Sequence, residues 1–193
     1  IDGRWVKPTK INDLEVIDPS TEEVCAIISL GSEPDTNLAV EAAKSSFISW
    51  WKTPKEEKLE LLKNLLNIYI NQSSEMASAI SKEMGAPKDW SLYQQSQSGE
   101  DHIKKFINKY KEFEFENYLD KKKGNYIAYE PIGVCALITP WNWPINQIAL
   151  KVLPALAAGC TMILKPSEIA PLSAILFAKM IHEAGFPNGV FNL

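Results

Sequence analysis

Residues 134–193 read VCALITPWNWPINQIALKVLPALAAGCTMILKPSEIAPLSAILFAKMIHEAGFPNGVFNL, in which short apolar runs alternate with segments of helical periodicity. The apolar runs predict strands and the periodic segments predict helices. In chain order they are a strand at 134–138, a helix at 144–158, a strand at 161–164, a helix at 171–184 and the start of a strand at 190–193. This order implies right-handed crossovers and a parallel sheet, so the fold class is α/β.

The charge distribution supports this interpretation. Only five of the chain's 20 basic and 24 acidic side chains lie within residues 134–193. Strands of a parallel sheet are usually covered on both faces, so we expect these strands to be buried. Because the chain ends within a predicted strand, we also expect further sequence after Leu193.

Composition excludes several classes of protein. The net charge is −4 and Arg4 is the only arginine, so no basic surface suited to nucleic acid is indicated. No run approaches the roughly 18 apolar residues of a membrane-spanning helix, so no membrane partner is expected. Cys25, Cys135 and Cys160 are widely spaced and form no metal-binding pattern. Each is interpreted as a buried free thiol in a reducing compartment, and we expect a cytoplasmic protein without a metal site.

Residues 1–112 predict two short strands followed by helices. Thr53–Glu56 has the residue types of a capping box for a helix that begins there. A later helix, from Pro87 to about Tyr110, is expected to bury Trp90 and Tyr93 together with its isoleucines, while His102 is expected on the surface. Residues 113–131 alternate apolar and acidic residues around a charged turn, which predicts a β-hairpin with Lys121–Lys123 solvated.

The loop after the strand at 134–138 is stiff. In the sequence Thr139-Pro140-Trp141-Asn142-Trp143-Pro144 two prolines bracket an asparagine, and proline restricts both itself and the preceding residue. A fixed amide donor can stabilise an oxyanion in a transition state. A rigid turn in which Asn142 only bonds its own backbone explains the same residues equally well.

The loop after the strand at 161–164 carries two of the five charges. In open α/β sheets ligands bind beyond the carboxyl ends of the strands, where Lys165-Pro166-Ser167-Glu168 is expected to lie. A carboxylate there can accept hydrogen bonds from ribose hydroxyls, and an ammonium group can donate to ribose oxygens or attract phosphate. The alternative is a solvated ion pair, worth about 0–1 kcal/mol. The sequence has no GxGxxG turn, so the common dinucleotide fingerprint does not apply.

Taken together, these segments closely resemble the NAD(P)-dependent aldehyde dehydrogenase superfamily, N-terminal part. The resemblance covers essentially the whole chain, and Trp143 and Ala170 are small departures where the family usually has Phe and Thr. The segments that carry it are Ile1–Val6, Asp18–Thr21, Glu130–Val134, Ile138–Pro144, Lys151–Gly159, Lys165–Glu168 and Ala184–Leu193. The resemblance implies an incomplete Rossmann-like parallel sheet of the cofactor domain, with N-terminal helices and a protruding hairpin.

The resemblance also implies a division of the chain and a partner. Residues 1–112 would be the N-terminal part of the NAD-binding domain, residues 113–131 an oligomerisation hairpin, and residues 132–193 the first β-α-β-α-β portion. The hairpin bridges subunits in the family, so a homodimer or homotetramer is implied for the complete enzyme.

The implied reaction oxidises an aldehyde to a carboxylic acid through a cysteine thiohemiacetal, with hydride passing to the nicotinamide. Asn142 would help to hold the oxyanion, and the other implied contacts are all to the cofactor: Ile138, Thr139, Pro140, Trp141, Lys165, Ser167 and Glu168. Because Glu168 would repel a 2′-phosphate, NAD is expected rather than NADP. The family's nucleophilic cysteine and its glutamate base lie in segments that this chain lacks, and neither Cys135 nor Cys160 matches the nucleophile.

Two other interpretations remain open. The chain could be a truncated non-catalytic module that binds nucleotide or another subunit, or it could belong to an acylating relative that releases a thioester to coenzyme A. A reading of the gene beyond the codon for Leu193 separates the enzyme from the truncated module.

Overall fold

A computed structural model of the chain describes residues 1–120, 122 and 124–193. The strands are β1 (Asp13–Asp18), β2 (Glu23–Ser29), β3 (Glu116–Asp120), β4 (Asn125–Ala128), β5 (Val134–Ile138), β6 (Thr161–Lys165) and β7 (Phe191–Asn192). The helices are α1 (Glu33–Lys52), α2 (Lys55–Asn71), α3 (Ser73–Met84), α4 (Lys88–Trp90), the π-helical η1 (Ser91–Ser96), α5 (Gln97–Glu112), α6 (Pro144–Ala158) and α7 (Leu172–Glu183).

The C-terminal third forms the parallel sheet that the sequence predicts. β5 pairs with β6 and β6 pairs with β7, all parallel, so the sheet order is β5-β6-β7. The register places Val134 opposite Thr161 and Ile138 opposite Lys165. The two loops singled out in the sequence therefore leave neighbouring strands at the same edge of the sheet. The predicted α/β fold class is confirmed.

The two faces of this sheet are covered unequally. Met162 and Leu164 are buried in the core against the helices, whereas the alternate residues of β6 face α1. On that second face the hydroxyl of Thr161 donates a hydrogen bond to the Ala43 carbonyl of α1, at 2.8 Å. The expectation of burial on both faces is wrong at the carboxyl end of β5, where Ile138 is 69% exposed. The hydrogen bond between Thr161 and α1 lies at the opposite, amino end of the strands.

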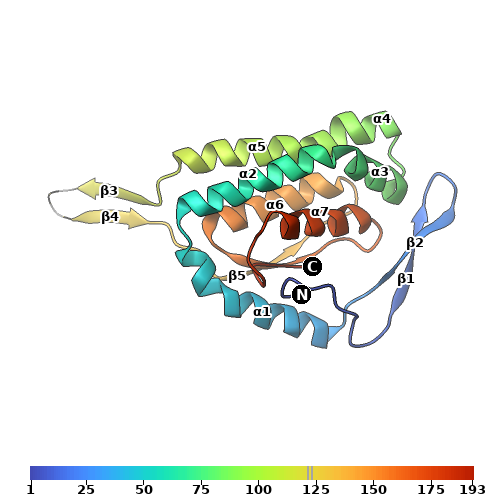
Figure 1. Cartoon of the computed structure of the whole chain (residues 1–193), viewed down its shortest axis with the longest axis horizontal. Coiled ribbons are helices and arrows are strands. Elements are labelled where there is room, and N and C mark those ends of the chain that lie inside the picture. Colours follow the sequence, from blue (N-terminus) through green and yellow to red (C-terminus); the bar gives the residue numbers. More distant parts are fainter. Residues whose placement is uncertain (121, 123) are drawn as a thin grey trace.

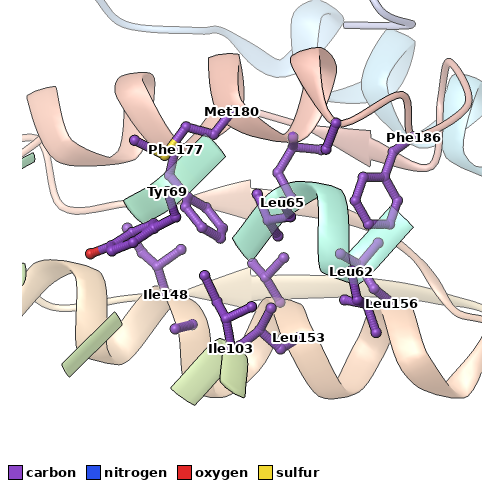
Figure 2. Close-up of a cluster of buried hydrophobic side chains, with 14 of the residues drawn as sticks. Leu62, Leu65, Tyr69, Ile103, Ile148, Leu153, Leu156, Phe177, Met180 and Phe186 are labelled. Carbon is purple, nitrogen blue, oxygen red and sulfur yellow. The ribbon is translucent and has the colours of Figure 1, made fainter. Parts of the chain in front are cut away.

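The main core lies between α2, α5, α6 and α7 (Figure 2). Leu62, Leu65 and Tyr69 recur along α2 at helical spacing, which turns one face of the helix towards its neighbours. The Tyr69 ring meets Phe177 of α7 edge to face, with centroids 6.4 Å apart. α6 and α7 lie against the sheet, and α2 and α5 pack on these two helices (Figure 1).

The first helices begin differently from the expectation. Thr53 does not open a capping box for α2: its hydroxyl donates to the Ser49 carbonyl at 3.0 Å and closes the last turn of α1. α2 begins at Lys55 without a side-chain cap. The capping box lies instead at the start of α1, where Asp35 accepts hydrogen bonds from the backbone N–H and the hydroxyl of Ser32.

The segment from Lys88 to Glu112 is helical, as predicted, but η1 interrupts its α-helical repeat. A π-helical turn shifts the phase of the residues that follow. Trp90 and Tyr93 are 48% and 66% exposed, so their predicted place in the core is wrong, and Gln95 is among the residues buried in their stead. His102 is half-buried rather than on the open surface, and its Nε2 lies 2.7 Å from Oδ1 of Asn146.

The predicted hairpin is present and projects from the body of the molecule (Figure 1). Its strands begin later than the alternation suggests, because Phe113 and Phe115 precede β3 and their rings meet edge to face, with centroids 4.9 Å apart. The prediction for the lysine turn falls on Lys121 and Lys123, which lie outside the described residues. The opposite end of Figure 1 carries the β1–β2 ribbon, which is also antiparallel.

Candidate functional site

A groove of about 940 Å³ lies at the carboxyl ends of β5 and β6. The N-terminal segment, the end of β2, the start of α1, β7 and the side of α7 that carries Ile175, Ala178 and Ile181 complete its walls. The N-terminal turn is held there because the Asp2 backbone N–H donates to the Asn192 side chain at 2.9 Å, which brings the two termini together (Figure 1). The groove is the place where an open α/β sheet is expected to take a ligand.

The loop after β6 contributes charge to this groove. Lys165, Ser167 and Glu168 all line it, and the Lys165 ammonium lies 2.6 Å from the Glu168 carboxylate. The hydrogen bond from Lys165 lowers the pKa of Glu168. Both side chains are about half exposed, so the pair is held in place weakly and can exchange partners with a ligand.

The loop after β5 turns away from the groove, and the last residue of the strand forms part of the wall. Ile138 lines the groove, and the backbone N–H of Thr139 donates to the Lys165 carbonyl at 3.2 Å, which ties the two loops together. Thr139 itself is buried, whereas Pro140 and Trp141 are exposed and lie outside the lining of the groove. Of the predicted cofactor contacts, the structure thus brings Ile138, Lys165, Ser167 and Glu168 together.

Asn142 is exposed, and within the described part of the chain its side-chain amide has no hydrogen-bond partner. The rigid-turn interpretation, in which Asn142 bonds its own backbone, is therefore not what the structure shows. The residue after it is anchored: the indole N–H of Trp143 donates to the Ser98 hydroxyl at 3.2 Å, and its ring meets Trp90 edge to face. These contacts fix the turn and leave the amide of Asn142 available to a ligand.

The cysteines lie away from this edge. Cys160 is buried just before β6, at the amino end of the strands, whereas Asn142 follows the carboxyl end of β5. Cys135 is half-buried in β5, and burial raises the pKa of its thiol to about 11. Cys25 is half-buried on β2, and burial raises its pKa as well. Across the residues that the structure describes, no group of His, Cys, Asp and Glu side chains is arranged to hold a metal ion.

Sequence reasoning missed two acidic residues that organise the surroundings of the groove. Asp35 lines it and accepts hydrogen bonds from the backbone and hydroxyl of Thr9 as well as from Ser32, which hold the pKa of its carboxyl well below the usual range. The Ser32-x-x-Asp35 spacing was the available signal. Glu83 is buried against the start of α7, and its signal was an acidic residue on the apolar stripe of Met76 and Ile80.

The architecture, a parallel sheet with α1 on one face, the other helices on the opposite face and two projecting hairpins, is that of solved aldehyde dehydrogenases. A crystal structure of an aldehyde dehydrogenase from Bartonella henselae superposes with a TM-score of 0.97 at 55% sequence identity, covering 100% of this chain and 41% of that one. Aldehyde dehydrogenase C from Pseudomonas syringae, a mutant solved with NAD⁺ and octanal, superposes with a TM-score of 0.96 at 44% identity, covering 100% of this chain and 39% of that one.

The profile of the aldehyde dehydrogenase family matches residues 5–193, and the chain belongs to that family. A 3-succinoylsemialdehyde-pyridine dehydrogenase from a Pseudomonas species is 48% identical over 194 residues, covering all of this chain and 40% of that protein. The chain therefore spans about 40% of the length of the curated relatives it matches. None of the described helices is both long and apolar enough to cross a membrane.

Proposed function

We propose that this chain forms the adenosine side of the NAD site of an aldehyde dehydrogenase that oxidises an aldehyde to a carboxylic acid. The observation that carries the proposal is the Lys165–Glu168 pair, which lines the groove at the carboxyl edge of a parallel sheet in a member of this family. The solved relative from Pseudomonas syringae contains NAD⁺, which supports the choice of cofactor.

The donor set fits an adenosine ribose. Ribose hydroxyls donate hydrogen bonds, and an ionised carboxylate offers only acceptors, so Glu168 suits them. Lys165 Nζ can donate to a ribose oxygen or attract the phosphate side. The backbone around Ile138, Thr139, Pro140 and Trp141 would run alongside the cofactor, and Ile138 is the residue of this segment that lines the groove. The groove is large enough for a substantial part of a dinucleotide.

When bound, NAD would supply the hydride acceptor for aldehyde oxidation. This chain would add the amide of Asn142, which would donate a hydrogen bond to the oxyanion formed when a cysteine attacks the aldehyde. Removal of one such donor typically costs about 3 kcal/mol in the transition state. The exposed position of Asn142 and the anchoring of Trp143 support this role.

The nucleophilic cysteine and the glutamate base would come from sequence outside these 193 residues. Cys160 is buried at the wrong edge of the sheet, and Cys135 has a raised pKa, which disfavours the reactive thiolate. The thiohemiacetal chemistry is thus assigned to the complete protein, and the identity of its aldehyde is left to residues beyond this chain.

The division of the chain is proposed to follow these roles. Residues 1–112 and 132–193 would both belong to the NAD-binding domain, and the hairpin at 113–131 would join subunits of a homodimer or homotetramer. The projection of β3 and β4 from the body supports the latter assignment, since Tyr118 and Leu119 are exposed there.

The choice of NAD over NADP is tested by Glu168→Gln in the protein expressed from its complete gene. The loss of a charged acceptor is expected to weaken NAD binding roughly 10-fold or more, and to reduce the preference for NAD, because hydrogen bonds to charged groups contribute about 1.5–3 kcal/mol. Calorimetric Kd values for NAD and NADP provide the measurement.

A matched control is Glu41→Gln. Glu41 pairs with Lys44 at 2.9 Å on α1 with the same three-residue spacing, and both side chains are well exposed. Its Kd values are expected to equal those of the unsubstituted protein. An unchanged ratio of NAD to NADP affinity in Glu168→Gln would remove Glu168 from the proposal.

A further inference from the structure

Glu83 is a fully buried carboxylate in the last turn of α3, with no exposed surface. It accepts hydrogen bonds from the backbone N–H groups of Leu172 and Ser173, the first two residues of α7. For Ser173 the distances to its two carboxylate oxygens are 3.3 and 3.2 Å. Burial raises the pKa of Glu83 to about 7, while these hydrogen bonds oppose the rise.

The Glu83 carboxylate caps the N-terminus of α7. The first N–H groups of a helix have no partner within the helix, and Pro171, which precedes α7, supplies no side-chain cap. A negative group is also favoured there by the helix dipole. Glu83 thus fixes the start of α7 from another helix, 89 residues earlier in the chain.

The start of α7 is one end of the loop that carries Ser167 and Glu168. The other end is held in the sheet, where Lys165 pairs with Ile138. Within this loop the backbone N–H of Ala170 donates to the Ser167 carbonyl and the N–H of Ile169 to the Ser167 hydroxyl, each at 3.3 Å. The placement of Glu168, four residues before Leu172, therefore depends on both anchors.

Glu83 does not itself line the groove. Among the described residues it forms no ion pair, and the hydrogen bonds that its carboxyl oxygens accept come from the backbone N–H groups of Leu172 and Ser173. A buried carboxylate without a cation is costly, and it is stable only where several donors converge on it. Here the donors that converge are those at the end of the loop.

We propose that Glu83 is a positioning residue for the loop from Pro166 to Pro171, and that it sets the affinity for the adenosine ribose through the placement of Glu168. This inference rests on the proposed NAD site. Glu83 would contact neither cofactor nor substrate.

The test compares Glu83→Gln with two variants, all in the protein expressed from its complete gene. Glu83→Asp keeps the carboxylate. Ile80→Val removes one buried methyl group from the same face of α3 and leaves Glu83 intact. The first readout, taken without nucleotide, is amide hydrogen exchange within residues 166–173, where every residue except Pro166 and Pro171 carries an N–H group. The second is the calorimetric Kd for NAD.

Glu83→Gln is expected to raise exchange at residues 166–173 at least 10-fold above that of Ile80→Val and to weaken NAD binding several-fold. Glu83→Asp is expected to recover part of both effects. If Glu83→Gln does not fold, Glu83→Asp is compared with Ile80→Val instead, and it is expected to show the faster exchange at residues 166–173 and the weaker NAD binding of the two. The proposal is overturned if the Glu83 variants exchange at residues 166–173 no faster than the unsubstituted protein, or if their Kd for NAD is unchanged.

The experiments distinguish a failure of the proposed NAD site from a failure of the proposed role of Glu83. If the unsubstituted protein binds no NAD, the proposed function is wrong, whereas the exchange experiment, which uses no nucleotide, still decides whether Glu83 fixes the loop.

Discussion

Gly99 lies where α5 crosses α2 and α6, and replacing it by Ala tests how tightly this crossing is packed. Gly99 is buried, and a Cβ built on it would lie 2.7 Å from Cζ of Tyr69 and 2.8 Å from Cγ1 of Ile145, and still closer to the Tyr69 hydroxyl. That hydroxyl donates a buried hydrogen bond of 2.8 Å to the Ser96 carbonyl in η1. The ring cannot withdraw without losing this bond.

The expected cost follows from three contributions. Overpacking of a tight core costs about 1–3 kcal/mol. Loss of the Tyr69 hydrogen bond costs about 1 kcal/mol. The higher helix propensity of Ala offsets about 1 kcal/mol. The free energy of unfolding should therefore fall by about 2 kcal/mol, which for a chain of this size lowers Tm by roughly 4–8 °C.

Thermal and urea unfolding followed by circular dichroism measure this difference. The double variant Gly99→Ala with Tyr69→Phe identifies its cause, because removal of the hydroxyl opens space for the new methyl group. Tyr69→Phe should destabilise the parent protein but have a smaller effect, or a favourable one, in the Ala background. A Gly99→Ala variant as stable as the parent, or strictly additive effects, would refute the packing argument.

Three further outcomes are expected. Thr161→Val should lower the free energy of unfolding by about 1 kcal/mol in urea titrations, because it removes the bond to Ala43; no change would show that α1 is held to β6 without it. Because the pKa of Asp35 is depressed in the folded protein, its contribution to the free energy of unfolding is complete above pH 3.8 and is lost as the pH falls further. Asp35→Asn should therefore lower the free energy of unfolding at neutral pH and make it less dependent on pH in the acid range. Parallel profiles of unfolding free energy against pH for the two proteins would contradict this. The 193-residue chain alone should oxidise no aldehyde and bind NAD weakly, and turnover abolished by Cys160→Ser would reverse that assignment.

Much of the fold could be predicted from local pattern alone. The helix at Ser73–Met84 and its end at Gly85, which has a positive φ of 72°, follow directly from periodicity and a left-handed glycine. The parallel sheet follows from the order of its strands and helices. The pattern failed where the helical repeat changes. The π-helical η1 separates the phase of Trp90 and Tyr93 from that of the isoleucines in α5, and the periodicity of the sequence did not predict this π-helical turn.

Part of the candidate site could also be predicted from the sequence, and part could not. Lys165 and Glu168 could be found because charges are rare in this part of the chain and follow a strand. Glu83 could not be assigned a partner, because its hydrogen bonds join residues about 90 positions apart, and only the packing of α3 on α7 brings them together. The wall formed by the N-terminal segment depends on a similar long-range contact, between Asp2 and Asn192.

The central claim is that Glu168 and Lys165 hold the adenosine ribose of NAD. A crystal structure of the protein expressed from its complete gene, with NAD bound, tests this claim most directly. The expected result is a Glu168 carboxylate within about 3 Å of the ribose hydroxyls, in the groove at the carboxyl ends of β5 and β6. A ribose bound elsewhere, with Glu168 still paired only to Lys165, would contradict the claim.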